Sequence, residues 1–445
     1  MGGLRAGAAA IDISPRKSLH LCGYPNVVRD STGVHDPLLS SALYLENGPA
    51  RMLLVANDII FVPKALAGRA RARLAERTGV PAERILVAAT HTHSGPLTVD
   101  RPYRRNGPDS PPPDAAYLAQ LEEGIVAAGA EAFRQARPAE AGFATADGSA
   151  VGTNRRDPSG PSNPVVPVLD IRDAATGKPL ALMVVCCMHP TVLHEDSLLV
   201  SADFPGMARR FLQARAVGPD CPVLYFTGPA GNQSPRHVTR SNTFEEAARL
   251  GGLLGASIEK ARAMVRHRRD VALEAAGGEV DLPRQVFMAA SRAEERERLA
   301  LERLESMRRR GDPRPAVRTA ECDWFGSTRR ARLARFAEEG RLEEAAARCM
   351  PAEIQALRIG DFTFVGWPGE LFIEFALDVM RAFPGTFMIA YANGETDGYL
   401  VTAEAAAEGG YEAATSIFKS PESGRLIVKR TEELLEEVKT VISNQ

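Results

Sequence analysis

Short runs of Val, Ile and Leu recur along the chain and alternate with segments whose apolar residues are three or four positions apart. Each short run ends in Gly, Pro, His or Asn and indicates a buried strand, whereas the spaced segments indicate helices. The strands expected from this pattern are Arg51–Asn57, Ile85–Ala89, Leu180–Cys187, Val223–Thr227, Phe362–Gly366 and Phe387–Tyr391. The alternation predicts an α/β fold in which helices flank a mixed β-sheet.

Helical spacing is clearest in Ala65–Thr78 and Ala115–Gln135. The proline-rich run Arg101–Pro113 has no periodicity and is expected to be a loop, either at the surface or at the rim of a site. From Ser291 to Arg348 the composition shifts to Arg, Glu, Ala and Leu in long helical runs. We interpret this segment as a charged helical insertion within a single domain, 1–445. Its charges indicate a solvated face or a cap over a site.

Charge and cysteine content narrow the class of protein. The 445 residues include 54 Lys and Arg against 56 Asp and Glu, so the basic excess expected of a nucleic-acid-binding protein is missing. The six cysteines form no CxxC pair, which argues against a zinc ribbon. No run approaches the roughly 18 apolar residues of a transmembrane helix, and the N-terminus lacks the apolar core of a signal peptide. We therefore expect a cytoplasmic protein with reduced thiols.

Two of the eight histidines, His91 and His93, directly follow the expected strand Ile85–Ala89, in the run Thr-His-Thr-His-Ser-Gly-Pro. Residues i and i+2 at the end of a strand point to the same side, so both imidazoles can face one pocket. Several unrelated metallohydrolases use such a pair, but ordinary hydrogen-bonded histidines also occur in this spacing. The pair alone therefore indicates a metal site that needs further ligands.

Two other strand ends supply candidates for those ligands. His189 follows the apolar run Leu182–Met188, and Glu370 follows the strand Phe362–Gly366. Taken singly, such a histidine is more often a core residue, and such a glutamate more often caps a helix. Taken together, two histidines and one glutamate match the three-ligand zinc sites of hydrolases, which keep one position for water. The sequence thus predicts a metal site at the carboxyl ends of strands.

A fourth strand, Val223–Thr227, leads into the glycine-rich run Gly228–Pro235. The backbone N–H groups of this run, together with Asn232 and Ser234, are candidates for an oxyanion pocket or for holding a polar substrate group. The run has neither the Gly-Lys-Ser/Thr ending of a phosphate-binding loop nor the GxSxG elbow of serine hydrolases.

Taken in order, these motifs resemble the neutral/alkaline, non-lysosomal ceramidase family, specifically its N-terminal catalytic domain. The resemblance runs through nearly the whole chain, and its most specific element is the heptapeptide from Thr90 to Pro96. The other matching motifs are Leu21–Tyr24, Gly33–His35, Asn57–Ile59, Asn154–Arg155, Met188–Thr191, Ser201–Asp203, Gly231–Pro235, Pro368–Glu370, Tyr399–Thr402 and Gly410–Glu412. No counterpart of the family's C-terminal β-sandwich-like domain is expected.

The resemblance implies one zinc ion per chain. Carried over motif by motif, its ligands are His91, His189, Glu370 and Tyr399, with the tyrosine as an unusual fourth ligand. The resemblance places His93 beside the metal-activated water rather than on the metal, where it would transfer a proton.

The same resemblance assigns further site residues. Arg155 and Tyr411 match residues that contact the scissile amide, so they are expected to bind substrate and to support the oxyanion. Ser234 matches a serine close to the metal and is expected to be a site residue rather than a nucleophile. Asp58 and Asp203 are candidates for orienting a ligand histidine, although structural polar contacts explain them equally well.

The implied reaction is hydrolysis of an amide bond by a metal-activated water. The expected substrate is a small-molecule or lipid-like amide, either ceramide-like or a smaller soluble N-acyl compound. An esterase or lactonase remains an alternative. A phosphoesterase is a further alternative, but it needs carboxylates for a second metal, and the motifs supply only Glu370. A non-catalytic binding module is the remaining alternative, and the presence of all five metal-site candidates argues against it.

Overall fold

An eight-stranded mixed sheet forms the centre of the computed structural model, which describes residues 3–104 and 111–443. Its strand order is β11-β9-β8-β6-β1-β3-β4-β5. The strands are β1 (Arg5–Asp12), β3 (Leu39–Asn47), β4 (Ala50–Asn57), β5 (Ile85–Ala89), β6 (Arg137–Asp147), β8 (Val165–Asp173), β9 (Pro179–Cys186) and β11 (Val223–Thr227). The outermost pairs, β4–β5 and β9–β11, are parallel, and the pairs between them are antiparallel.

The sheet consists of two arms that meet where β1 and β6 share only two residue pairs. Both arms contribute to one buried core, in which Leu54 of β4 and Leu224 of β11 belong to the same apolar cluster. The segment that follows β17 (Thr386–Ile389) hydrogen-bonds to the ends of both arms: the Ala89 N–H donates to the Tyr391 carbonyl, and the Ala390 N–H donates to the Thr227 carbonyl. The carboxyl ends of β5 and β11 therefore lie close together.

A second sheet packs against the same core. It has the order β13-β14-β15-β17 and comprises, besides β17, the strands β13 (Leu273–Val280), β14 (Ala352–Ile359) and β15 (Phe362–Gly366). Three two-stranded ribbons complete the described strands: β2 (Gly33–Val34) with β10 (Leu199–Val200), β7 (Thr153–Asn154) with β12 (Gln233–Ser234), and β16 (Glu370–Leu371) with β18 (Tyr399–Leu400).

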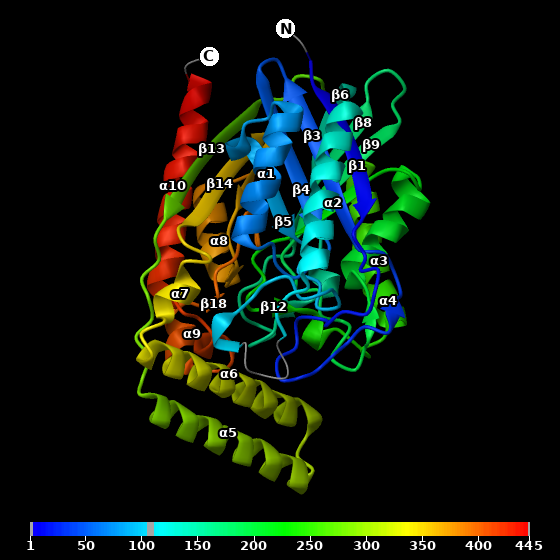
Figure 1. The fold of residues 1–445 in the computed structure, drawn as a ribbon. Coiled ribbons are helices and arrows are strands. Elements are labelled where there is room, and N and C mark those ends of the chain that lie inside the picture. The colour runs from blue at the N-terminus through cyan, green and yellow to red at the C-terminus, as the bar shows by residue number, and fades with distance from the viewer. Residues whose placement is uncertain (1–2, 105–110, 444–445) are drawn as a thin grey trace.

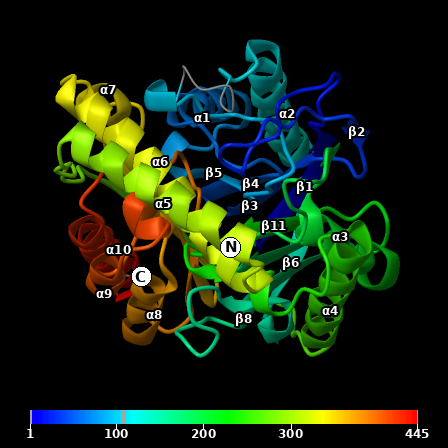
Figure 2. The same cartoon turned by 90° about the horizontal axis from the view of Figure 1, so that it is seen from below.

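Helices cover the outer faces of the sheets (Figures 1 and 2). The helices α1 (Lys64–Thr78) and α2 (Ala115–Arg134) lie on one arm, and α3 (Asp203–Leu212) and α4 (Phe244–Arg262) lie on the other. The second sheet is flanked by α8 (Ile373–Ala382) and α10 (Ser420–Ser443). Local signals explain several helix ends: Asp114 accepts the Tyr117 N–H at the start of α2, and α1 ends at Gly79 in the left-handed conformation.

A helical hairpin lies across one end of the molecule (Figure 1). It consists of α5 (Ala290–Arg310) and α6 (Arg314–Glu338), and the short helices α7 (Leu342–Ala346) and α9 (Ala403–Glu408) lie nearby. The turn between α5 and α6 begins at Gly311, whose φ of 69° suits glycine. None of the described helices combines the length and apolar composition needed to cross a bilayer.

The α/β fold class predicted from the sequence is confirmed. The strands Ile85–Ala89, Val223–Thr227 and Phe362–Gly366 match the structure residue for residue. The strand expected at Phe387–Tyr391 ends two residues earlier, because Tyr391 adopts a φ of 57° and leaves the extended conformation. Within the run expected as a loop, Arg101–Pro113, the short helix η2 (Pro102–Arg104) forms, while residues 105–110 lie outside the described part of the chain.

Candidate metal centre

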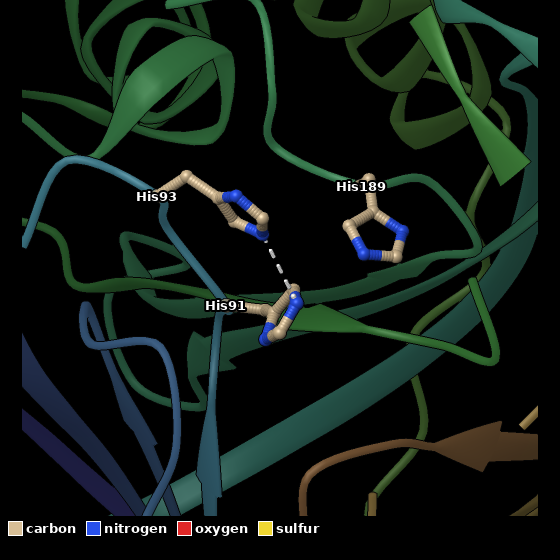
Figure 3. A group of neighbouring side chains, drawn as sticks. All are labelled: His91, His93 and His189. Carbon is tan, nitrogen blue, oxygen red and sulfur yellow. Dashed lines mark hydrogen bonds between the residues drawn. The ribbon is translucent and has the colours of Figure 1, made fainter. Parts of the chain in front are cut away.

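Three buried histidines converge where β5 and β9 end. His91 and His93 follow β5, and His189 follows β9. Nε2 of His91 lies 3.2 Å from Nε2 of His93, and the possible ligand atoms of all three rings lie within 4.8 Å of one another. Figure 3 shows the three rings grouped around one point. The prediction that strand ends bring these histidines together is confirmed, and among the described residues they form the one group of this kind.

Glu370 adds a carboxylate to the histidine group. Its Oε2 lies 3.3 Å from Nε2 of His189 and 3.5 Å from Nε2 of His91. Burial by itself would raise the pKa of Glu370, but the proximity of the His91 and His189 imidazoles holds this pKa well below its ordinary value. Burial also lowers the pKa of His189 to about 4. The glutamate is therefore ionised at neutral pH and His189 is uncharged.

Backbone carbonyls fix the tautomers of two of the rings. Nδ1 of His91 lies 2.8 Å from the Ile60 carbonyl oxygen, and Nδ1 of His189 lies 2.5 Å from the Ala230 carbonyl oxygen. A carbonyl only accepts, so each Nδ1 carries the proton and each Nε2 presents a lone pair. Two such lone pairs and a carboxylate crowded together are stable around a cation or a shared proton, and they are donors that Zn²⁺ prefers. The residues present therefore fit a metal ion.

His93 differs from the other two histidines. Its Nδ1 is buried without a hydrogen-bond partner among the described residues. The ring packs edge-on against Tyr24, with centroids 5.3 Å apart, and its backbone carbonyl accepts a hydrogen bond from the Arg29 guanidinium. Burial, followed by the neighbouring His91 and His189, lowers the pKa of His93 well below its ordinary value. Within residues 3–104 and 111–443, no hydrogen bond to a backbone group fixes which nitrogen of this ring carries the proton.

Tyr399, Tyr411 and Arg155 lie beside this group. The rings of Tyr399 and Tyr411 have centroids 5.8 Å apart, and the Arg155 guanidinium lies 5.2 Å from the centroid of the Tyr399 ring. Arg155 also donates to Glu412, 2.9 Å away, and to the Gly231 carbonyl oxygen, 2.7 Å away. Burial and the nearby Glu370 raise the pKa of Tyr399 well above its ordinary value. This phenol is therefore neutral even beside Arg155, and its ionisation requires a stronger nearby charge such as that of a metal ion.

Several of these side chains line one wall of a cavity, in which the centres of water molecules can occupy a volume of about 50 Å³. The residues of the candidate metal centre that line this wall are His91, His93, Glu370, Tyr399 and Tyr411. Such a volume is enough for a few ordered waters or a small polar group. The cavity thus gives a reacting group access to the metal-binding side of the histidines.

The structure gives Ser234 and Asn232 other contacts. The Ser234 hydroxyl accepts the Arg236 N–H at the start of the short helix η5 (Pro235–His237), and no hydrogen bond within the described residues joins Ser234 to the histidines. Its expected role in the site stays a prediction. The Asn232 amide donates to Glu374 and accepts the Ile373 N–H, so this side chain anchors the start of α8 and has little capacity left for an oxyanion.

The two aspartates considered as orienting groups do not contact the histidine rings through any described hydrogen bond. Asp58 pairs with Arg209 at 2.8 Å, and Asp203 accepts the N–H groups of Val192 and Leu193 in the loop after His189. Both aspartates therefore make structural polar contacts, and backbone carbonyls orient the histidine rings instead.

Sequence reasoning missed several residues of this region. The Tyr391 ring stacks on His91, with centroids 3.9 Å apart and an interplanar angle of 7°. Tyr24, Arg104 and Arg329 line the cavity. Arg104 lies in the proline-rich run, where a site rim was one of the two expectations, whereas nothing in the helical pattern of α6 distinguishes Arg329 from its neighbours.

Comparison with known proteins places this fold. No family model and no curated protein matches the chain. The solved structures that match it include one of neutral ceramidase from Pseudomonas aeruginosa and one of a ceramidase complexed with C2. Each is 18% identical in sequence, has a TM-score of 0.72, and is aligned over 96% of this chain and 74% of its own. The resemblance expected from the motifs is therefore confirmed at the level of the fold, which is that of a neutral ceramidase.

Proposed function

We propose that this protein is a zinc-dependent hydrolase that cleaves the amide bond of an N-acyl compound. The observation that carries the proposal is the convergence of two tautomer-fixed imidazoles and one carboxylate at the edge of a cavity that His91 and Glu370 line. The fold shared with structures described as ceramidases favours an amide as the bond that is cleaved.

The ligands in this proposal are His91, His189 and Glu370, with Tyr399 as the fourth. When bound, zinc polarises a substrate carbonyl and lowers the pKa of a water molecule towards about 7. Tyr399 is supported by its position opposite Glu370 in the β16–β18 ribbon. The high pKa that burial gives its phenol means that it would ionise only next to the metal charge.

His93 would move the proton. Its Nδ1 has no fixed partner and its ring lines the cavity, so either nitrogen can carry the proton, as an acid–base residue requires. During hydrolysis a bond forms between the water oxygen and the acyl carbon and the C–N bond breaks. His93 would deliver the water proton to the departing amine, giving a carboxylic acid and an amine without any redox change.

Arg155 and Tyr411 would stabilise the oxyanion. The Tyr411 ring lines the cavity next to Tyr399. The Arg155 guanidinium donates to Glu412 and to the Gly231 carbonyl, and these two hydrogen bonds do not use all of its N–H groups. Arg155 does not line the cavity, so its charge would act mainly through the Tyr399 ring that it contacts. Ser234 is retained as a proposed site residue with a supporting role.

Residues 1–445 would form one catalytic domain, in which the charged insertion covers the site. Two contacts of α6 support the cap: Arg329 lines the cavity, and Gly326 packs against the backbone of Tyr411. A Cβ at Gly326 would lie 3.2 Å from the Tyr411 Cα, so the close approach depends on this glycine.

Esters and lactones need the same chemistry and are the second candidate class. A phosphoesterase with two metal ions is less well supported, because the described residues contain a single metal-capable group.

The test is hydrolysis of a panel of N-acyl compounds by zinc-loaded protein, with and without a chelator, alongside a metal-content measurement. We expect amide cleavage that the chelator abolishes and zinc restores, with one zinc ion per chain. Two metal ions per chain together with phosphate-ester cleavage would contradict the proposal.

A further inference from the structure

The cavity beside the histidines has a second wall built from arginines. Arg101 and Arg104 come from the segment around η2, and Arg329 comes from α6. All three line the same cavity as His91 and Glu370. Three guanidinium groups next to a candidate metal centre concentrate positive charge on this wall.

Two of the three arginines have carboxylate partners. Oδ1 of Asp397 accepts from Nη2 of Arg329 at 2.5 Å and lies 3.0 Å from Nε of Arg101. Nη2 of Arg101 also donates to Glu395, 3.2 Å away. Two carboxylates are therefore available to neutralise the charges of three guanidinium groups. Burial raises the pKa of Glu395 to about 7, so near neutral pH this carboxyl supplies less than a full negative charge.

Arg104 has no such partner within the described part of the chain. Its Nε is buried and makes no hydrogen bond there, and none of the described carboxylates lies within ion-pair distance of its guanidinium. Burial lowers the pKa of Arg104, and the positive charges of Arg329 and Arg101 lower it further. A partly buried guanidinium without a counter-charge among the described residues is costly, and an anion bound beside it would relieve that cost.

The rest of the cavity lining is mainly apolar. Apolar side chains, including Ile60, Phe61 and Val99, line it together with the groups already named. Its free space of about 50 Å³ accommodates a small oxyanion. A neutral lipid with two long chains would leave Arg104 desolvated and without a partner. A carboxylate is the smallest organic anion that matches the two-pronged donor geometry of a guanidinium.

We propose that the substrate is an N-acyl amino acid, whose carboxylate is bound by Arg104 while its amide lies at the histidine group. The inference rests on the proposed amide hydrolysis and names the substrate class for that site. Arg104 is a specificity-determining binding residue, and Arg101 and Arg329 maintain the positive field around it. The products are a fatty or short-chain carboxylic acid and a free amino acid.

The experiment compares matched substrates that differ only in charge. Zinc-loaded protein is given an N-acylglycine, the glycinamide and methyl ester of the same compound, the corresponding N-acyl taurine, and a short-chain ceramide. Release of the amine is measured, so that hydrolysis of the methyl ester group is not scored. Because charged hydrogen bonds contribute about 1.5–3 kcal/mol, we expect kcat/KM for the N-acylglycine to exceed that for its glycinamide by roughly 10- to 100-fold.

A variant assigns the preference to one side chain. In Arg104→Gln we expect the ratio of kcat/KM between N-acylglycine and glycinamide to fall towards one. Arg309→Gln on α5 is the matched control, because Arg309 is 70% exposed and lies outside the cavity lining, and it should keep the wild-type ratio. Thermal unfolding and zinc content of each variant establish that the fold and the metal centre are intact. If Arg104→Gln does not fold, the inference is tested by the wild-type ratio of kcat/KM between N-acylglycine and glycinamide alone.

The outcomes separate this inference from the proposed function. Cleavage of the ceramide or the glycinamide as fast as N-acylglycine overturns the inference and leaves amide hydrolysis standing. Preference for the taurine conjugate overturns the assignment to a carboxylate, and an unchanged ratio in Arg104→Gln overturns the role of this residue. If no amide in the panel is cleaved, the proposed function fails and the inference fails with it.

Discussion

Glu370 and Tyr399 are directly opposite each other in the register of the parallel ribbon β16–β18. The ribbon therefore presents a carboxylate and a phenol side by side on the cavity wall, although 28 residues of chain lie between the two positions. Both side chains are buried, and Glu370 reaches two histidine nitrogens. One small ribbon thus joins the histidine group to the tyrosine.

Removing the carboxylate is expected to weaken metal binding more than removing the phenol. In Glu370→Gln the neutral amide loses the charge that faces Nε2 of His91 and His189. Zinc affinity should fall by more than the roughly 10- to 100-fold that loss of an outer partner costs. Tyr399→Phe should cost less, because this phenol must first be ionised. Competition with a zinc indicator measures both, and equal affinities of wild type and Glu370→Gln would exclude Glu370 as a ligand.

His91 and His93 are expected to behave differently when replaced, although they are two residues apart. His91→Gln should lose zinc and activity together, because its Nε2 is held towards Glu370 by the Ile60 carbonyl. His93→Gln should keep zinc but lose about 10²- to 10⁴-fold in kcat, the range for an acid–base residue. His35→Gln is the control, because the His35 side chain lies outside the cavity lining and stacks on Phe244 instead. Loss of zinc in His93→Gln would make His93 a ligand instead.

Glu395 is expected to make stability depend on pH. Burial raises its pKa from 4.5 to about 7, so the folded state holds the proton more tightly than the unfolded state. The resulting stabilisation is complete below about pH 4.5 and is lost as the pH rises to about 7, a change on the order of 3 kcal/mol. In Glu395→Gln this fall should disappear.

Urea unfolding of the wild type and Glu395→Gln at about pH 5 and about pH 8 measures the effect. The variant should gain stability relative to the wild type as the pH rises. Glu422→Gln, whose side chain is 57% exposed, should follow the wild type. A constant difference between Glu395→Gln and the wild type at both pH values would show that the carboxyl titrates normally.

Much of the fold could be predicted because continuous apolar runs form its strands. Ile85–Ala89 and Val223–Thr227 are buried at every position, and such runs leave little ambiguity about where a strand begins and ends. The location of His91 and His93 follows from the strand that precedes them. Their meeting with His189 depends on how the two arms of the sheet share one core, which no local pattern encodes.

The orienting contacts of the site could not be predicted for a different reason. Carbonyl groups of Ile60 and Ala230 fix the histidine tautomers, and any residue type supplies a carbonyl. The nearby aspartates looked suitable in the sequence but bind Arg209 and backbone N–H groups instead. The role proposed for Arg104 could not be predicted either. It depends on the absence of a carboxylate near Arg104 among the described residues, and a sequence does not show which arginines lack such a partner in the fold.

Gly23 is expected to control the position of the His93 ring. It has a φ of 116°, and a Cβ built on it would lie 2.6 Å from Cγ of His93. Gly23→Ala should therefore displace the ring, lowering kcat while zinc content stays unchanged, because His91, His189 and Glu370 are not touched. Gly48→Ala is the control for a positive φ without a clash: its φ of 58° lies in the left-handed region, where an alanine costs about 1 kcal/mol, and nothing lies within 4 Å of its Cβ. Gly23→Ala should lose more stability than Gly48→Ala in urea unfolding, because its φ is less accessible to alanine and its Cβ meets the His93 ring, and only Gly23→Ala should lose activity. Equal activity of the two would mean that the contact between Gly23 and His93 does not position the proton-transferring ring.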